Sequence, residues 1–591
     1  MPELPTALAR SIVKRADSIP QFLEELAKEL TGQDLSAIPS TLQDLLTARL
    51  DALGAAKLVA QQAATIGRGF TLDFLCRIAS LDEKAVGHAL RQLRSAGLLH
   101  LVAPTAFQFS HALLRDAAYQ SQTRPERQAT HLRIAKALQS DADVRPELLA
   151  QHWTAGGQLR EAARCWLAAS QLARQQSAHQ EVILHCREGL DVLAQLPDDV
   201  QRQSLECDLQ IKLGASLCAT QGYTCAQGAA AYTRAMALCA DAQQEPHVDL
   251  FIALWGLWAS ASQRVDYNHS QELAQQLQRM AQNLGDPVHI QQACFAKGVT
   301  HFRQGHFEDA HRQFRQVQAL YEPTQHTSHV ARFGEDVGVT NGSHRSGVLW
   351  LMGCADQSLR TSGQTVAYAR QLEHPYSLAY ALTYAMLLHC NMRQPVACLA
   401  LADETLALAQ QHGFALWQMG AALLRGWAMA QMKMPQGLEL MQQCVNATRA
   451  ALGSVEVMGL EPLAQASISA GRADLALATL DEAFATGSAK ADHHLDAELH
   501  RLQGEALLLQ SPSNAAQAVV CFQAALHISQ QQHAKVFELR AATSLARLWK
   551  KKRKAQAAHA LLAGVYEAFS EGFDTPDLQD ARQLLVRLTP P

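Results

Sequence analysis

The sequence lacks the short motifs that mark the common enzyme classes. It has no G-x-x-x-x-G-K-[ST] loop to cradle phosphates, no H-E-x-x-H pair for zinc and no G-x-S-x-G elbow for a nucleophilic serine. A G-x-G-x-x-G loop after a predicted strand is also missing. We therefore expect no catalytic residues and no cofactor, and we expect that the chain is not an enzyme.

Paired cysteines and long apolar runs are missing too. The 13 cysteines include no C-x-x-C pair, and their odd number argues against a disulfide framework or structural zinc. Residues 1–10 contain no apolar segment of a signal peptide, and no run approaches the 18 apolar residues of a membrane helix. We therefore expect a cytoplasmic protein with free thiols and no membrane contact.

Charge is sparse and balanced. Charged residues make up 18% of the chain and the net charge is −4, so no general attraction to nucleic acid is expected. The one dense basic run, "KKKRK" (550–554), is interpreted as a solvated turn between helices, with an anion-binding patch as the alternative. The histidine clusters His493-His494 and "HTSHV" (326–330) are likewise interpreted as solvated turns, and no metal site is expected.

What the sequence does contain is helical periodicity. After residue 145, apolar residues recur at i, i+3, i+4 and i+7, and hinges such as "GQLREA" (157–162) and "GHFEDA" (305–310) recur at steps of about 40 residues. Further hinges begin at Gly353, Arg393, Lys433, Gly471, Ser513 and Lys552. This period predicts an all-α, tetratricopeptide-like solenoid over residues 145–591, with about ten helix pairs. An irregular helical domain is the alternative.

Small residues early in the second helix of each unit would let the two helices approach closely. The sixth hinge positions are small at Ala162, Ala310, Ser358, Cys398, Ala476, Ala518 and Ala557, and Leu438 is the exception. Tryptophans also fall on helical faces, and the sequence leaves open which are core and which line a concave binding groove. They are Trp255, Trp258, Trp350, Trp417 and Trp427.

Residues 35–140 follow a different pattern. Residues 39–67 predict two helices, residues 71–97 predict two more, and "LLHLVAPTAFQFS" (98–110) predicts a hairpin. Helices followed by a hairpin are typical of a winged-helix domain. Its candidate recognition helix, residues 82–96, carries several polar side chains, so DNA binding is an alternative function, although no second basic element accompanies it. These side chains are Lys84, His88, Arg91, Gln92 and Arg94.

The order of these pieces resembles the C-terminal half of bacterial signalling ATPases of the STAND class, which are often fused to a nucleotide cyclase or protein kinase. "ADSIPQFLEEL" (16–26) is similar to the end of the ATPase lid, and "IPSTLQDLLTARLDALG" (38–54) and "FQFSHALLRDAAYQS" (107–121) are similar to winged-helix segments. Four later segments are similar to the family's repeats: "LWGLW" (254–258), "LRGWAMA" (424–430), "ELRAATSLARLW" (538–549) and "EGFDTPDL" (571–578).

The resemblance implies a lid remnant over residues 1–34, a winged-helix-like domain over 35–140 and the repeat array. It also implies vestigial nucleotide contacts at Pro20, in the lid motif, and at His111, in the winged helix. Two departures weaken the lid match, because Ser18 replaces the family's glycine and Gln21 its leucine. The phosphate-binding loop is missing, so ATPase and cyclase activities are not carried over to this chain.

Three hypotheses follow. In the favoured one, the chain is a non-enzymatic regulatory protein that binds a protein or ligand on the concave face of the solenoid. The winged helix would then relay that event to an ATPase core supplied in trans. In the second, the winged helix binds DNA as part of a transcription regulator. In the third, the sequence is a fragment of a full ATPase–cyclase polypeptide.

Overall fold

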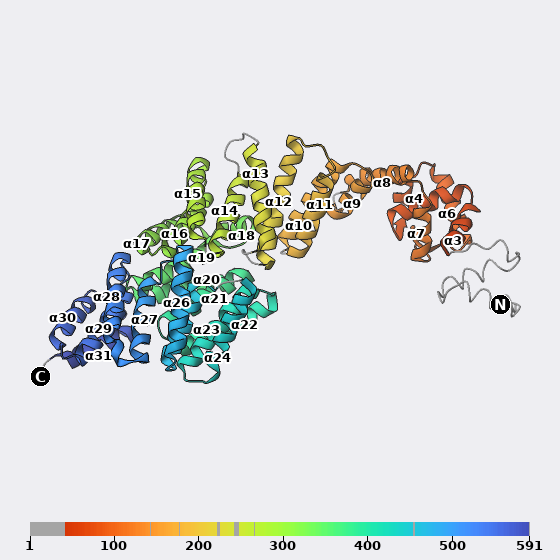
Figure 1. Ribbon diagram of the computed structural model, residues 1–591. Helices are drawn as coiled ribbons and strands as arrows, with labels where there is room; N and C mark the ends of the chain where they lie inside the picture. The colour runs from red at the N-terminus through yellow and green to blue at the C-terminus, as the bar shows by residue number, and fades with distance from the viewer. Residues whose placement is uncertain are drawn as a thin grey trace, which may run out of the picture. The chain divides into compact units, whose positions relative to one another are not determined.

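The structure is a computed structural model that describes residues 42–589, apart from positions 142, 177, 222–224, 242–247, 265 and 453–454. The expected lid remnant, with Pro20, lies outside the described residues. The chain divides into two compact units, and helices α10 (Leu159–Gln175) and α11 (His179–Leu193) are each shared between them (Figure 1). Each unit is considered by itself below.

The first unit contains a small three-stranded sheet surrounded by helices. Its strands β1, β2 and β3 are antiparallel in the order β1-β3-β2, and β2 and β3 confirm the predicted hairpin. The unit's elements are α3 (Leu42–Asp51), α4 (Ala55–Ile66), β1 (Gly69–Thr71), α5 (Leu72–Ile78), α6 (Glu83–Ser95), β2 (Leu99–Ala103), β3 (Ala106–Phe109), α7 (Ala112–Gln120), α8 (Arg124–Gln139) and α9 (Pro146–Ala155). This order agrees with the winged-helix prediction, which remains a prediction.

Local signals explain where several of these helices begin. Thr71 and Asp82 accept hydrogen bonds from the backbone N–H groups of Phe74 and Ala85, and so cap α5 and α6. Thr123 and Glu126 form a capping box at the start of α8. Apolar side chains from α3–α8 and all three strands then form one core beneath the sheet.

The second unit is a solenoid of antiparallel helix pairs, as the sequence predicted. Within the described residues, nine pairs run in order, and α31 (Pro576–Leu588) follows them. The pairs are α12 (Val200–Gln221) with α13 (Ala226–Asp241), α14 (Val248–Gln263) with α15 (Tyr267–Leu284), α16 (Pro287–Arg303) with α17 (Phe307–Leu320), α19 (Val337–Leu351) with α20 (Ala355–Gln371), α21 (Pro375–Asn391) with α22 (Pro395–His412), α23 (Ala415–Gln431) with α24 (Gln436–Leu452), α25 (Val457–Ser469) with α26 (Ala473–Lys490), α27 (Asp496–Gln510) with α28 (Ala515–Gln532), and α29 (Lys535–Lys551) with α30 (Ala555–Tyr566).

The predicted hinges coincide with the turns inside the pairs. Gly305, Gly353 and Gly471 take positive φ angles there, and so do the non-glycine residues Arg393 and Lys433. Lys552 lies in the turn of the last pair, directly before the left-handed Arg553. Ser513 lies between α27 and α28, in the short 3-10 helix η3 (Pro512–Asn514). An extra helix, α18 (His326–Phe333), lengthens the step between the hinges at Gly305 and Gly353.

The expected small residues do lie where paired helices meet. Six of the seven are fully buried: Ala162, Ala310, Ser358, Cys398, Ala476 and Ala518. The prediction for Ala557 was wrong by one residue, because Ala557 is exposed and Ala558 is buried in its place. In the pair with Leu438, which is the exception in the sequence pattern, Gly437 makes the close approach. A Cβ at Gly437 would lie 2.7 Å from the carbonyl oxygen of Gly426 and 2.8 Å from the Cα of Ala430.

The end of the solenoid packs back against its middle. Arg393, at the end of α21, reaches Asp577 and Asp580 of α31, at 3.1 and 3.0 Å. Gln357 of α20 bonds to Glu571, more than 200 residues away in the sequence. These contacts bring helices α29–α31 beside α19–α21. Because most solenoid repeats touch only their neighbours, this closure adds a long-range constraint.

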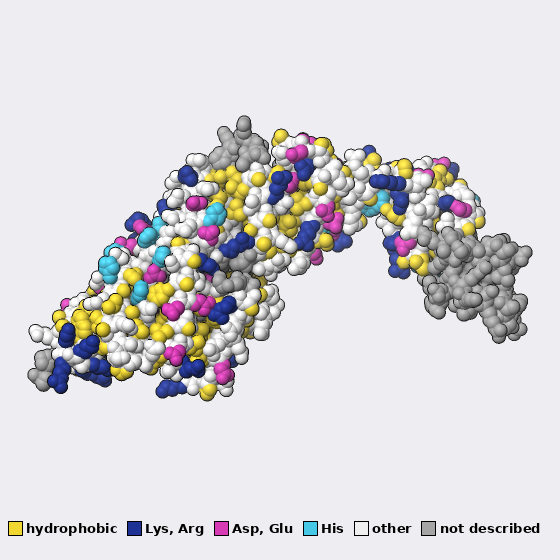
Figure 2. All heavy atoms as spheres, viewed as in Figure 1, with side chains coloured by type: hydrophobic (Ala, Val, Ile, Leu, Met, Phe, Trp, Pro, Cys, Tyr) yellow, Lys and Arg dark blue, Asp and Glu magenta, His cyan; other side chains and the backbone are white. Residues whose placement is uncertain are grey.

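Two surface predictions can be compared with the structure. The basic run at 550–554 is exposed at the turn between α29 and α30, and Figure 2 shows Lys and Arg side chains gathered over this end of the solenoid. Within the described part of the chain, no helix has both the length and the apolar character needed to cross a bilayer.

Candidate ligand-binding site on the inner helices of the solenoid

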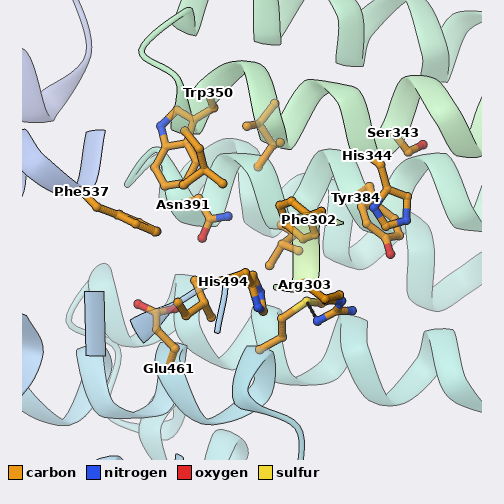
Figure 3. Close-up of a pocket in the computed structure, with 16 residues that line it drawn as sticks. Phe302, Arg303, Ser343, His344, Trp350, Tyr384, Asn391, Glu461, His494 and Phe537 are labelled. Atoms are coloured by element: carbon orange, nitrogen blue, oxygen red, sulfur yellow. Dashed lines mark hydrogen bonds between the residues drawn. The ribbon is translucent and has the colours of Figure 1, made fainter. Parts of the chain in front are cut away.

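The first helix of each pair contacts the first helix of the next pair, and we call these the inner helices. They are α12, α14, α16, α19, α21, α23, α25, α27 and α29. Inner helices far apart in the sequence, or residues at their ends, surround one central cavity (Figure 3). Its labelled lining residues are Phe302, Arg303, Ser343, His344, Trp350, Tyr384, Asn391, Glu461, His494 and Phe537. The site therefore depends on the solenoid's curvature and on no single repeat.

Arg303, the last residue of α16, is the charged centre of this region. It is 7% exposed and lines three adjoining cavities. Its guanidinium lies 5.5 Å from the ring centre of Tyr267 and 3.7 Å from the carboxylate of Asp492, and it donates to the sulfur of Met458 at 3.0 Å. Since a thioether is a weak acceptor, the nearby carboxylate and the ring are its main electrostatic partners.

The second cavity, which we call the Glu335 cavity, is rich in aromatic rings. Tyr380 and Tyr384 stack with ring centres 4.8 Å apart, and His344 donates to or accepts from the Tyr380 hydroxyl at 2.9 Å. The full lining is Trp255, Trp258, Ala259, Ser262, Phe295, Val299, Arg303, Glu335, His344, Tyr376, Tyr380, Tyr384 and Glu456. Burial, with Arg303 and His494 nearby, lowers the pKa of His344 to about 3, so this imidazole is neutral at pH 7.

The third cavity, which we call the apolar hollow, opens between α21, α23, α24 and α25. Its volume is about 200 Å³, and most of its wall is apolar, including Leu387, Trp417 and Leu423. Arg303 and Glu456 lie on its wall as well and connect it with the Glu335 cavity. An apolar cavity with a few polar groups at one side is the usual form of a ligand site.

Two neighbouring acidic residues beside this site, Asp336 and Glu335, have different surroundings. Asp336 caps α19 by accepting from the N–H of Val339 at 3.0 Å, and it also bonds to Tyr321 and His326. Burial alone would raise the pKa of Asp336, but these hydrogen bonds lower it. For Glu335, burial and the nearby Asp336 raise the pKa to about 8.

A network of buried charges joins the inner helices to the closing helices. Arg540 of α29 contacts Glu498 of α27 at 3.0 Å and Asp577 of α31 at 2.9 Å. Arg501 makes two 2.8 Å hydrogen bonds to Glu498. Although burial raises the pKa of Glu498, Arg501 and Arg540 lower it to about 2, so this carboxylate stays ionised.

All five tryptophans that the sequence left open are buried, and four of them also line cavities. Trp255 and Trp258 line the Glu335 cavity, Trp350 the central cavity and Trp417 the apolar hollow. Trp427 is fully buried in the core, where its indole N–H donates to Gln465 at 2.6 Å. Sequence reasoning missed Arg303 and Glu335, because no motif surrounds either residue.

The interpretation of the histidine clusters as solvated turns was wrong for two residues. His494 is buried and pairs with Asp492 at 2.6 Å, and His329 is fully buried behind α16. Among the described residues, no group of three His, Cys, Asp or Glu side chains is arranged to hold a metal ion. His111 is the N-cap residue of α7 in the first unit and is partly exposed, so its nucleotide contact remains a prediction.

Comparison with known proteins finds one distant curated relative. No protein-family model matches the chain. An uncharacterized protein of Rhizobium meliloti (strain 1021) is 23% identical over 555 residues, which cover 90% of this chain and 53% of that protein. The chain thus spans about half the length of this relative.

Several solved structures share the helical-repeat architecture. The Cut9–Hcn1 assembly of the APC/C is 12% identical, with a TM-score of 0.41 over 93% of this chain and 96% of that one. A STAND protein with a tetratricopeptide repeat sensor from Pyrococcus horikoshii is 10% identical, with a TM-score of 0.30 over 90% and 74%. A Rap protein complexed with Competence and Sporulation Factor is 11% identical, with a TM-score of 0.36 over 68% and 99%. These scores carry no argument about function.

Proposed function

We propose that this chain is a non-enzymatic interaction protein whose solenoid binds a partner protein or ligand on its inner helices. In this proposal the solenoid is the sensor half of a STAND-type signalling system. The first unit, as a winged helix, relays binding to an ATPase core. Pro20 and His111 would be the vestigial nucleotide contacts, with the core supplied in trans or by a longer polypeptide.

The observation that supports this proposal most is the placement of buried charge in a cavity. Arg303 and Glu335 are each less than a tenth exposed, yet both line hollows between inner helices. Asp492 already compensates Arg303, but no described residue pairs with Glu335, and burying a charge is costly unless something compensates it. A bound ligand can provide that compensation.

Site-specific crosslinking tests the proposal in the full chain. A photoreactive residue at Leu416, which lines the apolar hollow, is expected to capture a partner in the native host cytosol. The control places the same residue at Val396, which is 70% exposed on α22, outside the inner set. Capture from Leu416 and not from Val396 supports binding on the inner helices. Equal capture from both, or from neither, contradicts it.

A second candidate function is DNA binding by the first unit. The polar side chains of α6 that suggested it, including His88, Arg91 and Arg94, are all exposed. Gel shifts over a salt series would detect it, because phosphate contacts weaken as salt rises. If Arg91→Ala with Arg94→Ala leaves binding unchanged, or if the full chain shows no salt-sensitive shift, this function is refuted.

The link to an ATPase core has its own test. The intact mass of the native protein, purified from its host with an antibody to the repeats, is compared with 64.5 kDa. A much larger mass would support a core within the same polypeptide, and an equal mass would favour a core in trans.

A further inference from the structure

Glu335 is a buried acidic side chain with which no positively charged group of the described residues pairs. It is 6% exposed and lines the Glu335 cavity, and no described residue gives its carboxylate a hydrogen bond or an ion pair. Asp336 beside it has three hydrogen-bond partners. Buried carboxylates normally resemble Asp336, since an unpaired charge at low dielectric is unfavourable. Glu335 therefore has the features of a group whose partner is a ligand.

The rest of the cavity wall provides what an organic cation requires. Aromatic rings from two inner helices line it together with Glu335: Trp255 and Trp258 come from α14, and Tyr376 and Tyr380 from α21. The electron-rich faces of such rings attract ammonium and guanidinium groups, and Trp attracts them most strongly. A carboxylate beside these rings adds a full opposite charge.

The balance of charges also favours a cation. The charged groups that line the cavity are Arg303, Glu335 and Glu456, and His344 is neutral at pH 7. Arg303 already lies beside Asp492, which is fully buried. Burial raises the pKa of Glu335 to about 8, so in the empty cavity it is mostly protonated at pH 7, and a bound cation would favour its ionised form. With both glutamates ionised, the lining is net negative, so a cation would be attracted where an anion would be repelled.

The size of the space limits the ligand. The Glu335 cavity has a volume of about 40 Å³, which exceeds the roughly 10–15 Å³ that one water molecule needs and is enough for one small head group. The adjoining apolar hollow, at about 200 Å³, has room for an apolar body. The two spaces share Arg303, Tyr384 and Glu456 on their walls.

We propose that the solenoid binds an organic cation, with its ammonium or guanidinium head against Glu335 and its apolar body in the apolar hollow. This names the ligand class of the proposed function and rests on it. The cation could belong to a free amine or to a lysine or arginine side chain of a peptide, and the head-group chemistry is the same.

Matched probes of opposite charge test the proposal on the full chain. Hexylamine and hexanoate have similar apolar chains and opposite head groups, and their binding is followed by calorimetry and by tryptophan fluorescence. Hexylamine is expected to bind more tightly than hexanoate. Glu335→Gln is expected to weaken hexylamine about ten- to hundredfold, in line with loss of a charged hydrogen bond. Glu322→Gln, at an exposed position, is the control and should bind as the wild type does.

A second variant probes the rings independently of the carboxylate. Trp258→Leu keeps an apolar wall but removes a ring face, and it should weaken hexylamine several-fold while leaving hexanoate unchanged. The proposal is overturned if hexanoate binds more tightly than hexylamine, if neither probe binds, or if Glu335→Gln binds hexylamine as the wild type does.

The source of the cation is distinguished by a third probe, the acetylated and amidated tripeptide Leu-Lys-Leu. Tighter binding of this peptide than of hexylamine indicates a peptide side chain, whereas binding of hexylamine alone indicates a free amine.

Failure of the cation proposal can be told apart from failure of the proposed function. If Leu416 captures a partner but hexylamine does not bind, the cation proposal fails and the proposed function survives. If hexylamine binds but Leu416 captures nothing, the partner-protein form of the function fails.

Discussion

Replacing Arg540 with methionine should release the closing helices α29–α31 from α19–α21. Arg540 is 8% exposed and donates to Asp577 at 2.9 and 3.0 Å, to Glu498 at 3.0 Å and to the carbonyl of Asn391, and its guanidinium lies 5.2 Å from the ring centre of Trp350. Methionine keeps much of the apolar volume, so the loss is mainly electrostatic. Removing one partner of a buried ion pair costs about 3–5 kcal/mol.

The lower end of that range applies here, because both carboxylates keep one other arginine. Arg501 stays on Glu498 and Arg393 stays on Asp577. A cost of about 3 kcal/mol corresponds to roughly a hundredfold faster local opening. Hydrogen exchange measured by mass spectrometry should show this acceleration in α19–α21 and α29–α31. Helices α12–α15 should be unaffected, because repeats couple mainly to their neighbours.

The control for this prediction is Arg547→Met. Arg547 is about half exposed and contacts Asp580 at 3.3 Å, so its loss should cost less than about 1 kcal/mol. The reasoning is refuted if Arg540→Met leaves the protection of α29–α31 unchanged. It is also refuted if protection falls equally in all helices, since that would be global unfolding and not loss of a local closure.

Three further predictions follow from particular residues. Glu335→Gln should stabilise the fold around α19 and slow its hydrogen exchange by an amount equivalent to about 3 kcal/mol at pH 7. Since burial raises the pKa of Glu335 from 4.5 to about 8, the wild-type protein loses stability as the pH rises, and the stabilisation by the variant should grow from pH 5 to pH 9. Gly437→Ala should lower the thermal unfolding midpoint through a clash with the backbone of α23, whereas Gly420→Ala, with open space around its Cβ, should leave it equal or slightly higher. Burial lowers the pKa of both His131 and His152 to about 4, so the packing of α8 with α9 should be most stable above pH 6.5 and should weaken as the pH falls toward 4. Hydrogen exchange in these helices should therefore speed up at low pH, and His152→Asn should make it less dependent on pH.

The solenoid could be predicted because its determinants are local. Each hinge and each small residue lies within one helix pair, so a repeating pattern in the sequence reveals them. The errors are local as well. Ala557 was expected at the close contact, but Ala558, one residue later, is buried there instead. Strand β1 was missed because a three-residue strand is too short to show an alternating pattern.

The candidate site could not be predicted in the same way, because its residues come from different repeats. Glu335 precedes α19, Trp258 belongs to α14 and Tyr376 to α21, and only the curvature of the solenoid brings them to one cavity. Both Trp258 and Trp427 are buried and have the same helical spacing of apolar neighbours, so no periodicity shows that Trp258 lines a cavity and that Trp427 lines none of the three. A repeat pattern specifies how neighbours pack, and it leaves the inner positions free to differ.

Closure and binding are physically connected in this arrangement. The central cavity is lined by Trp350 and Phe537, from helices that meet only because α29–α31 pack back on α19–α21, and their rings lie 5.7 Å apart. Arg540 stacks on that same Trp350 and also holds the closing helices through Asp577. A change that opens the closure must therefore alter the wall of the cavity. By reciprocity, a ligand that binds only the closed form must strengthen the closure. Hydrogen exchange of α29–α31 with and without hexylamine would measure that coupling, and equal exchange in both conditions would show that binding and closure are independent.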